Sequence, residues 1–169
     1  MEFIYIDNSN VFIEGQRASG KAKGMQTLDR GYKIDFGMLY RFATGSAVDI
    51  EIGRAALFGS RPPPNDSIWK IAESAGFEVH LQDRNAGNKE KKVDTGIVTM
   101  MLTDLYESAS PGDRFTLVAG DGDFVPAIKK VREKGHDVDL VFWENVSREL
   151  REAASNFSIL NLNTLRLLT

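Results

Sequence analysis

Residues 115–142 read FTLVAGDGDFVPAIKKVREKGHDVDLVF, and this stretch decides the fold. The apolar residues 115–119 predict a β-strand, and residues 124–134 follow a helical pattern. Gly135 lies where a helix C-cap belongs, and residues 138–142 predict a second strand. A strand, a helix and a strand in this order are the repeating unit of a parallel sheet covered by helices.

The same alternation runs through the rest of the chain. Further strands are predicted at residues 3–6, 52–58 and 77–81, with a short sixth at 158–160. Further helices are predicted at residues 36–43, 67–75, 93–107 and 147–154. Asp35 and Asp66 are expected N-caps, and Gly76 an expected C-cap. The pattern therefore indicates a single α/β domain without internal repeats.

Two segments depart from this alternation. Residues 15–33 (GQRASGKAKGMQTLDRGYK) are rich in Gly and Lys and show no sustained periodicity, which predicts a mobile loop. Residues 61–65 (RPPPN) contain three prolines, which prevent a regular helix and predict a stiff connector.

Composition excludes several classes of protein. With 169 residues, 42% hydrophobic and 27% charged, the chain is neither disordered nor fibrous. No apolar run reaches the roughly 20 residues that span a bilayer, so no membrane partner is expected. The start MEFIYID lacks the features of a secretory signal, and we expect a cytoplasmic location. The net charge of −3 argues against a nonspecific nucleic-acid binder.

The absence of cysteine excludes disulfides, thiolate metal sites and a cysteine nucleophile. Both histidines, His80 and His136, lie in or beside apolar strand-like runs, and we expect structural roles for them. A metal site in this chain must therefore use oxygen ligands, which favour hard ions such as Mg²⁺ or Mn²⁺.

Aspartates follow two of the predicted strands. Asp7 follows FIYI and Asp121 follows FTLVAG, so both carboxylates should emerge at the carboxyl ends of parallel strands, where open α/β sheets bind ligands. Either could instead be a turn residue. Asp123, one glycine further on, brings a third carboxylate to this edge, although it could also be an N-cap. Asn8, Ser9 and Asn10 complete the first loop, and their polar groups could orient ligands.

Asp94 belongs to the helix predicted at residues 93–107. Asp94, Val98, Met101 and Leu105 are spaced by four, three and four residues, which puts the carboxylate on the apolar face directed at the sheet. A buried carboxylate needs a partner, and repulsion among several acids favours a divalent cation. The alternative is an acid stabilised by the helix dipole.

A basic segment precedes Asp94. Residues 84–92 (RNAGNKEKK) hold four basic residues and one acidic residue. The basic side chains, which could bind a phosphate backbone beside the acidic site, are Arg84, Lys89, Lys91 and Lys92. The alternative is an ordinary solvated loop.

The motifs YIDNSN, KKVDTGIVTMML and VAGDGDFVPAIKKVREKGHDVDLV together resemble the NYN domains of the LabA-like branch of PIN-like nucleases. The likeness extends from residue 3 to about residue 157. It implies a Rossmann-like parallel sheet of order 3-2-1-4-5, with helices on both faces and an acidic metal site that cleaves RNA. Its functional residues correspond to Asp7, Asn10, Asp94, Asp121 and Asp123, the four aspartates being the metal ligands. Ser155 stands where the family often has an acid.

The resemblance implies hydrolysis of RNA phosphodiester bonds assisted by Mg²⁺ or Mn²⁺, most simply by an endoribonuclease. RNA, single-stranded or structured, is the implied partner, and formation of a homo-oligomer is left as an open alternative. A PIN-like module that binds RNA with negligible turnover is the main alternative. A phosphatase of the haloacid-dehalogenase type needs an aspartate where Ser9 stands, and a Toprim-type domain leaves Asp94 unexplained.

Overall fold

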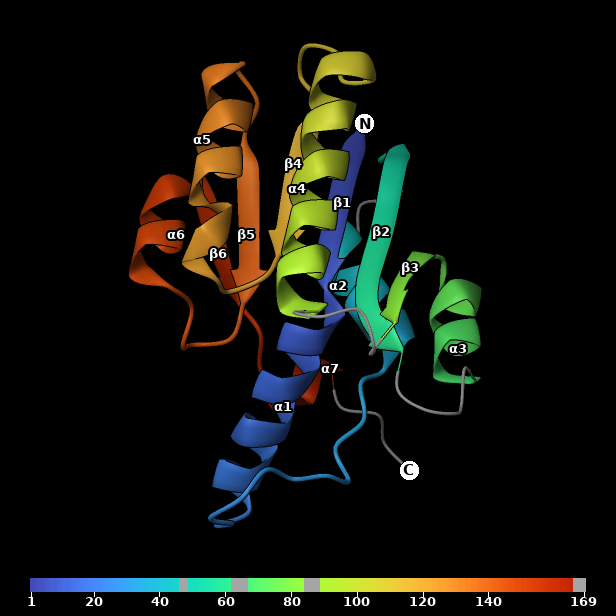
Figure 1. Ribbon diagram of the computed structural model, residues 1–169, viewed down its shortest axis with the longest axis vertical. Coiled ribbons are helices and arrows are strands. Elements are labelled where there is room, and N and C mark those ends of the chain that lie inside the picture. The colour runs from blue at the N-terminus through green and yellow to red at the C-terminus, as the bar shows by residue number, and fades with distance from the viewer. Residues whose placement is uncertain (46–48, 62–66, 84–88, 166–169) are drawn as a thin grey trace.

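A six-stranded parallel β-sheet with helices on both faces forms the protein (Figure 1). The computed structural model describes residues 1–45, 49–61, 67–83 and 89–165. Its strands are β1 (Glu2–Asp7), β2 (Ile52–Arg61), β3 (Glu78–Asp83), β4 (Arg114–Val118), β5 (Val138–Phe142) and β6 (Asn156–Ile159). The sheet order β3-β2-β1-β4-β5-β6 confirms the predicted order and adds the short sixth strand at one edge.

The helices form two layers. They are α1 (Asn8–Ala22), α2 (Phe36–Thr44), α3 (Ser67–Ala75), α4 (Lys89–Glu107), α5 (Val125–Glu133), α6 (Arg148–Ala153) and α7 (Leu162–Leu165), with a 3₁₀ turn η1 (Gly122–Phe124) before α5. One apolar core joins the sheet to α1, α2, α3 and α7, and a second joins its opposite face to α4, α5 and α6. No helix among the described residues combines the length and apolar character needed to cross a bilayer.

β1 lies at the centre of the sheet and supplies both cores. Ile4 and Ile6 belong to the first core, whereas Phe3 and Tyr5 belong to the second, as the two-residue period of a strand requires. Hydrogen-bonded pairing places β2 on one side of β1 and β4 on the other. All strands run the same way, so their carboxyl ends share the edge at which Asp7 ends β1.

Three of the predicted helix caps are found in the structure. Asp35 caps α2, its carboxylate accepting a hydrogen bond from the Met38 amide at 3.0 Å. Gly76 and Gly135 follow α3 and α5 with φ of 122° and 93°, a backbone region that favours glycine. The predicted cap Asp66 lies outside the described residues, as does the proline connector predicted at residues 61–65 except Arg61, which ends β2.

The loop predicted for residues 15–33 is wrong in its first part, because α1 continues to Ala22. Two interior glycines weaken the helical signal of this segment in the sequence, because glycine in a helix costs about 1 kcal/mol relative to alanine. Their small size is needed for packing. A Cβ on Gly15 would lie 2.4 Å from the Tyr32 ring, and one on Gly20 would lie 2.4 Å from the Thr27 carbonyl oxygen.

A buried polar network joins α4 to the middle of the sheet. Asp104 is 2% exposed and accepts hydrogen bonds from the Tyr5 hydroxyl at 2.6 Å and from Arg54 Nε at 2.6 Å. Burial and the Asp104 hydrogen bond raise the pKa of Tyr5, and the same carboxylate raises the pKa of Arg54. These contacts satisfy Asp104 within the fold, so this acid is not a candidate ligand.

Candidate metal centre

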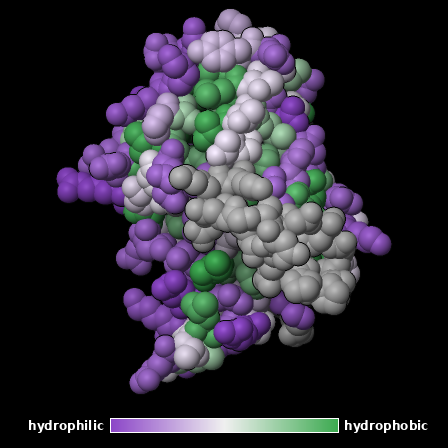
Figure 2. Space-filling model, viewed as in Figure 1, coloured by the Kyte–Doolittle hydropathy of each residue, from purple (hydrophilic) through white to green (hydrophobic). Residues whose placement is uncertain are grey.

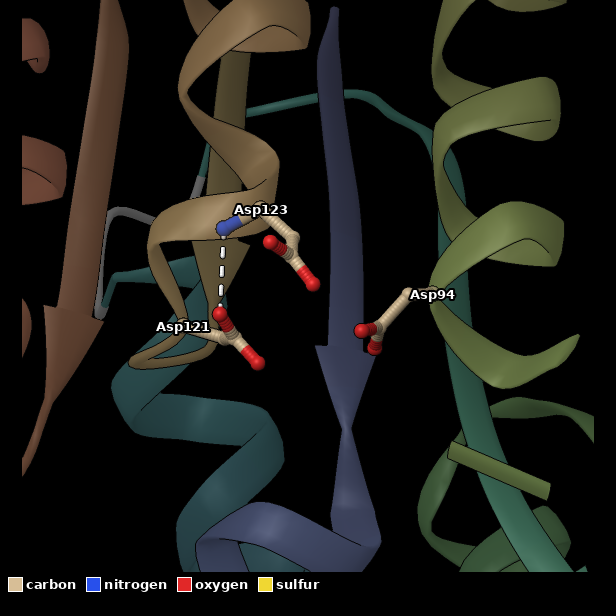
Figure 3. A group of neighbouring side chains, drawn as sticks. All are labelled: Asp94, Asp121 and Asp123. Carbon is tan, nitrogen blue, oxygen red and sulfur yellow. Dashed lines mark hydrogen bonds between the residues drawn. The ribbon is translucent and has the colours of Figure 1, made fainter. Parts of the chain in front are cut away.

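Three aspartates meet at the carboxyl edge of the sheet. Asp94, Asp121 and Asp123 each offer one carboxylate oxygen, and these oxygens all lie within 4.8 Å of one another. Figure 3 shows Asp94 reaching from α4 on one side of β1, with Asp121 and Asp123 facing it from the other side. Residues almost thirty positions apart in the sequence therefore share one small volume.

The loop from β4 to α5 is closely constrained. Asp121 caps the η1 turn, and its Oδ1 accepts a hydrogen bond from the Asp123 amide at 3.0 Å. A Cβ on Gly120 would lie 2.2 Å from the Phe142 ring, so only glycine fits at that position. The N-cap role considered for Asp123 is wrong, because α5 begins after Phe124 without a side-chain cap.

Ser147 braces the same loop from the next connection, a contact that sequence reasoning missed. Its amide donates a hydrogen bond to the Gly120 carbonyl oxygen at 2.9 Å. Its hydroxyl caps α6 and lies 3.2 Å from where a Cβ on Gly122 would stand. A serine before a predicted helix signals a cap, but the contact with Gly122 has no local signature.

α4 presents Asp94 near its first turns. Val93, Ile97 and Met101 form the buried row of this helix, with exposed fractions of 3% or less. Of the predicted apolar face, Met101 and Leu105 are buried, whereas Val98 is only partly buried and Asp94 lies next to the buried Val93. This placement leaves the Asp94 carboxylate partly exposed to solvent and turned toward the loop after β4.

Asp7 and Asn10 lie at the start of α1, which replaces the expected first loop. Asp7 is 5% exposed and caps the helix by accepting a hydrogen bond from the Asn10 amide at 3.3 Å. Asp7 is not a member of the group of three close carboxylates. Its part as a fourth metal ligand, and that of Asn10 in catalysis, stay predictions. The Asn8 amide oxygen is buried and has no hydrogen-bond partner among the described residues.

The basic residues expected to bind RNA fall largely outside what the structure describes. Arg84 lies outside the described residues, as do the side chains of Lys89, Lys91 and Lys92. The backbone of the three lysines forms the first turn of α4, so this helix begins four residues earlier than predicted.

Three further side chains singled out in the sequence take part in packing. His80 stacks on Phe58 at 4.9 Å between ring centroids. His136 packs edge-on against a phenylalanine, and its Nδ1 lies 2.8 Å from a backbone carbonyl oxygen. Ser155 accepts a hydrogen bond from the Val138 amide at 2.9 Å, at the amino end of β5 and so at the opposite edge from the carboxylates.

The donor set suits a hard divalent cation. Two oxygens on opposite sides of one Mg²⁺ ion lie about 4.2 Å apart, because each bond is about 2.1 Å long, so the observed spacing needs little adjustment. Among the described residues, no lysine or arginine forms an ion pair with Asp121 or Asp123. Clustered carboxylates repel one another, and a cation at their centre would relieve that repulsion.

Comparison with known proteins supports the fold and the family. Residues 3–161 match the NYN domain. A crystal structure of a protein of unknown function from Vibrio parahaemolyticus is similar, with a TM-score of 0.74 and 21% identity over 98% of this chain and 95% of that one. A search of the curated proteins found no match. The chain therefore belongs to the NYN domain family, within the PIN-like nuclease superfamily.

Proposed function

We propose that the protein is a metal-dependent endoribonuclease of the cytoplasm that uses Mg²⁺ or Mn²⁺. The observation that carries this proposal is the convergence of Asp94, Asp121 and Asp123 at the carboxyl edge of a parallel sheet, in a chain of a nuclease family. Ligand sites of open α/β sheets lie at this edge.

The three close aspartates would hold the ion, with Asp7 as a fourth ligand supplied from the end of β1. A divalent ion bound there offsets phosphate charge and lowers the pKa of water. Asn10 would orient polar groups beside Asp7.

Part of the proposed metal site is preorganised by hydrogen bonds within the protein. One oxygen of Asp121 is held by the Asp123 amide, and the backbone beneath it is held by Ser147. These bonds restrict the Asp121 carboxylate and the loop beneath it, so less of their freedom is lost when an ion binds. Asp121 and Asp123 are exposed, which leaves the site open to a polymer phosphate.

The same cluster should weaken RNA binding at the site when no metal is present. Three carboxylates repel the phosphates of RNA until a cation reduces their charge. We expect Arg84, Lys89, Lys91 and Lys92 to add favourable contacts with the phosphate backbone.

The test is an incubation of labelled RNA and DNA strands with Mn²⁺, Mg²⁺ or chelator. RNA should be cut with either metal and stay intact in chelator, and a circular RNA should be opened if cleavage is internal. Asp94→Asn should lose about a hundredfold or more in rate. Glu51→Gln, an equal charge change at an exposed acid beside the amino end of β2, should keep the wild-type rate.

Cleavage that persists in chelator would overturn the metal-dependent mechanism. RNA binding without turnover in either metal would instead identify the alternative, a PIN-like module that binds RNA. Cleavage of DNA with RNA left intact would overturn the proposed substrate class.

A further inference from the structure

The second half of α1 and the segment that follows it project beyond the sheet. In Figure 1, α1 continues from the end of β1 away from the strands, and the chain then turns back toward α2. We call residues 15–33 the basic arm. They contain five basic residues and one acidic residue, a formal charge of +4, so the remainder of the chain carries −7. Figure 2 shows hydrophilic side chains around a few hydrophobic ones at this end of the molecule.

All the positive charges of the arm are exposed. They are Arg17, Lys21, Lys23, Arg30 and Lys33. Arg17 pairs with Glu14 at 3.2 Å, and Lys23 pairs with Asp29 at 2.7 Å. The other three form no ion pair with any residue that the structure describes. The arm therefore carries three cationic groups that are available to an anionic partner.

The return segment is fixed against the helix. The Asp29 carboxylate accepts hydrogen bonds from the Ser19 hydroxyl at 2.6 Å and from the Gly31 amide at 3.0 Å. The Asp29 amide donates to the Gln16 carbonyl oxygen at 3.0 Å, and the Tyr32 ring lies over Gly15. Because these contacts order the backbone of the arm in advance, a partner that binds it has little backbone freedom to remove.

The helix that leads into the arm, α1, starts at the edge of the sheet that carries the metal centre. Asp7 caps α1, and Lys21 follows it by fourteen residues, which corresponds to about 21 Å along a helix. Stacked nucleotides of one strand rise about 3.4 Å each, so this distance covers about six nucleotides. A strand whose phosphate lies at the carboxylates can therefore reach the arm with its neighbouring nucleotides.

We propose that the basic arm binds the phosphate backbone of the nucleic-acid strand that is cut at the carboxylates, about six nucleotides from the scissile bond. This inference rests on the proposed function. A strongly acidic site in a chain of net charge −3 needs a separate positive surface to attract a polyanion, and the arm supplies it at the end of a helix that starts at the same edge. The contacts are with phosphates, so they add affinity without base specificity.

The experiment compares two triple variants of equal charge. The arm variant carries Lys21→Ala, Arg30→Ala and Lys33→Ala. The control variant carries Lys70→Ala, Lys129→Ala and Lys134→Ala, at exposed lysines on and next to α3 and α5. Binding of a labelled RNA of about 20 nucleotides, longer than the arm's span, is measured in chelator over a range of salt concentrations. Hydrolysis of bis(p-nitrophenyl) phosphate in Mn²⁺ measures the chemistry without a polymer.

The arm variant should lose about 0.7 from the slope of log affinity against log salt for each lost contact, or about 2 in all. Over a fourfold rise in salt its affinity then falls about sixteenfold less than that of the wild type. The single variant Lys21→Ala should show about a third of this change in slope, and it tests the arm if the triple variant folds poorly. Hydrolysis of the small diester should be unchanged in every variant.

Equal slopes in the arm variant and the wild type would overturn the inference, as would equal losses in the arm and control variants, which would reflect net charge alone. Binding of the wild type to anionic lipid vesicles with no binding to RNA would also overturn it. Failure of the proposed function looks different, because the wild type would then hydrolyse neither RNA nor the small diester in Mn²⁺.

Discussion

Replacing Asp123 by asparagine tests the carboxylate cluster through stability as well as through activity. The change keeps the size of the side chain and removes a charge within 4.8 Å of two other carboxylates. Two like charges about 5 Å apart repel by about 0.8 kcal/mol in water. Because Asp121 and Asp123 are exposed, the water value is the appropriate one, and Asp123→Asn should relieve roughly 1 to 2 kcal/mol in chelator.

For a chain of this length, 1 kcal/mol shifts the melting temperature by about 2 to 4 °C. Asp123→Asn should therefore melt at the same temperature as the wild type or a few degrees higher in chelator. In Mn²⁺ at a hundredfold excess over its dissociation constant, the wild type should gain about 2.7 kcal/mol, or roughly 5 to 11 °C, and the variant much less.

The assay is a pair of thermal melts for each protein, one in chelator and one in Mn²⁺, with Glu51→Gln as the matched loss of an exposed acid. The control should show the full shift in Mn²⁺. A shift of wild-type size in Asp123→Asn would show that this carboxylate does not hold the ion. A clear fall in its melting temperature in chelator would show that Asp123 stabilises the fold and is not strained.

Three further changes test other parts of the structure. Tyr5→Phe leaves Asp104 with one buried hydrogen bond fewer and should lower the free energy of unfolding by about 1 to 2 kcal/mol in denaturant titration; no change would show that the bond is not formed. Hydrogen bonds from a lysine and a serine lower the pKa of Asp29 to about 2, so the stability that this carboxylate confers is present above about pH 4 and is lost as the pH falls toward 2. Asp29→Asn should therefore reduce the fall in melting temperature between about pH 4 and pH 2. An unchanged fall over this range would refute the assignment. Gly122→Ala should weaken Mn²⁺ binding severalfold, because the added methyl group crowds the Ser147 hydroxyl. The double variant with Ser147→Ala should recover much of this Mn²⁺ affinity. If the losses of affinity in the two single variants instead add up in the double variant, the two positions are independent.

The sheet could be predicted because its signals are local. Most strands are apolar runs bounded by turn residues, and α2, α3, α5 and α6 have a capping side chain or a glycine at an end. The exception is α1, whose interior Gly15 and Gly20 are poor helix formers when only the sequence is considered. Glycine is needed at both positions because Tyr32 and Thr27 pack closely against them. These two residues belong to the segment after the helix, and such contacts produce no periodic pattern in the sequence.

The acidic site shows the same division. Asp121 and Asp123 could be placed from the strand before them, and Asp94 from its helix, since each position depends on neighbouring residues. The exact row of α4 that faces the sheet could not be placed, because Val93 and Asp94 are adjacent and both begin a row of apolar residues. The brace by Ser147 depends on how two loops approach one another, and this is a property of the folded chain alone.

The passage from β1 to α1 has no linking residue: Asp7 is the last residue of the strand and Asn8 is the first of the helix. A joint of this kind has no hinge, so the direction of the helix is set by the central strand of the sheet. The projecting end of α1 therefore has a fixed direction relative to Asp7 and the central strand. If α1 is rigid, the basic arm stays at a constant distance from the carboxyl ends of the strands, and the proposed contact would then favour nucleic-acid strands long enough to span that distance.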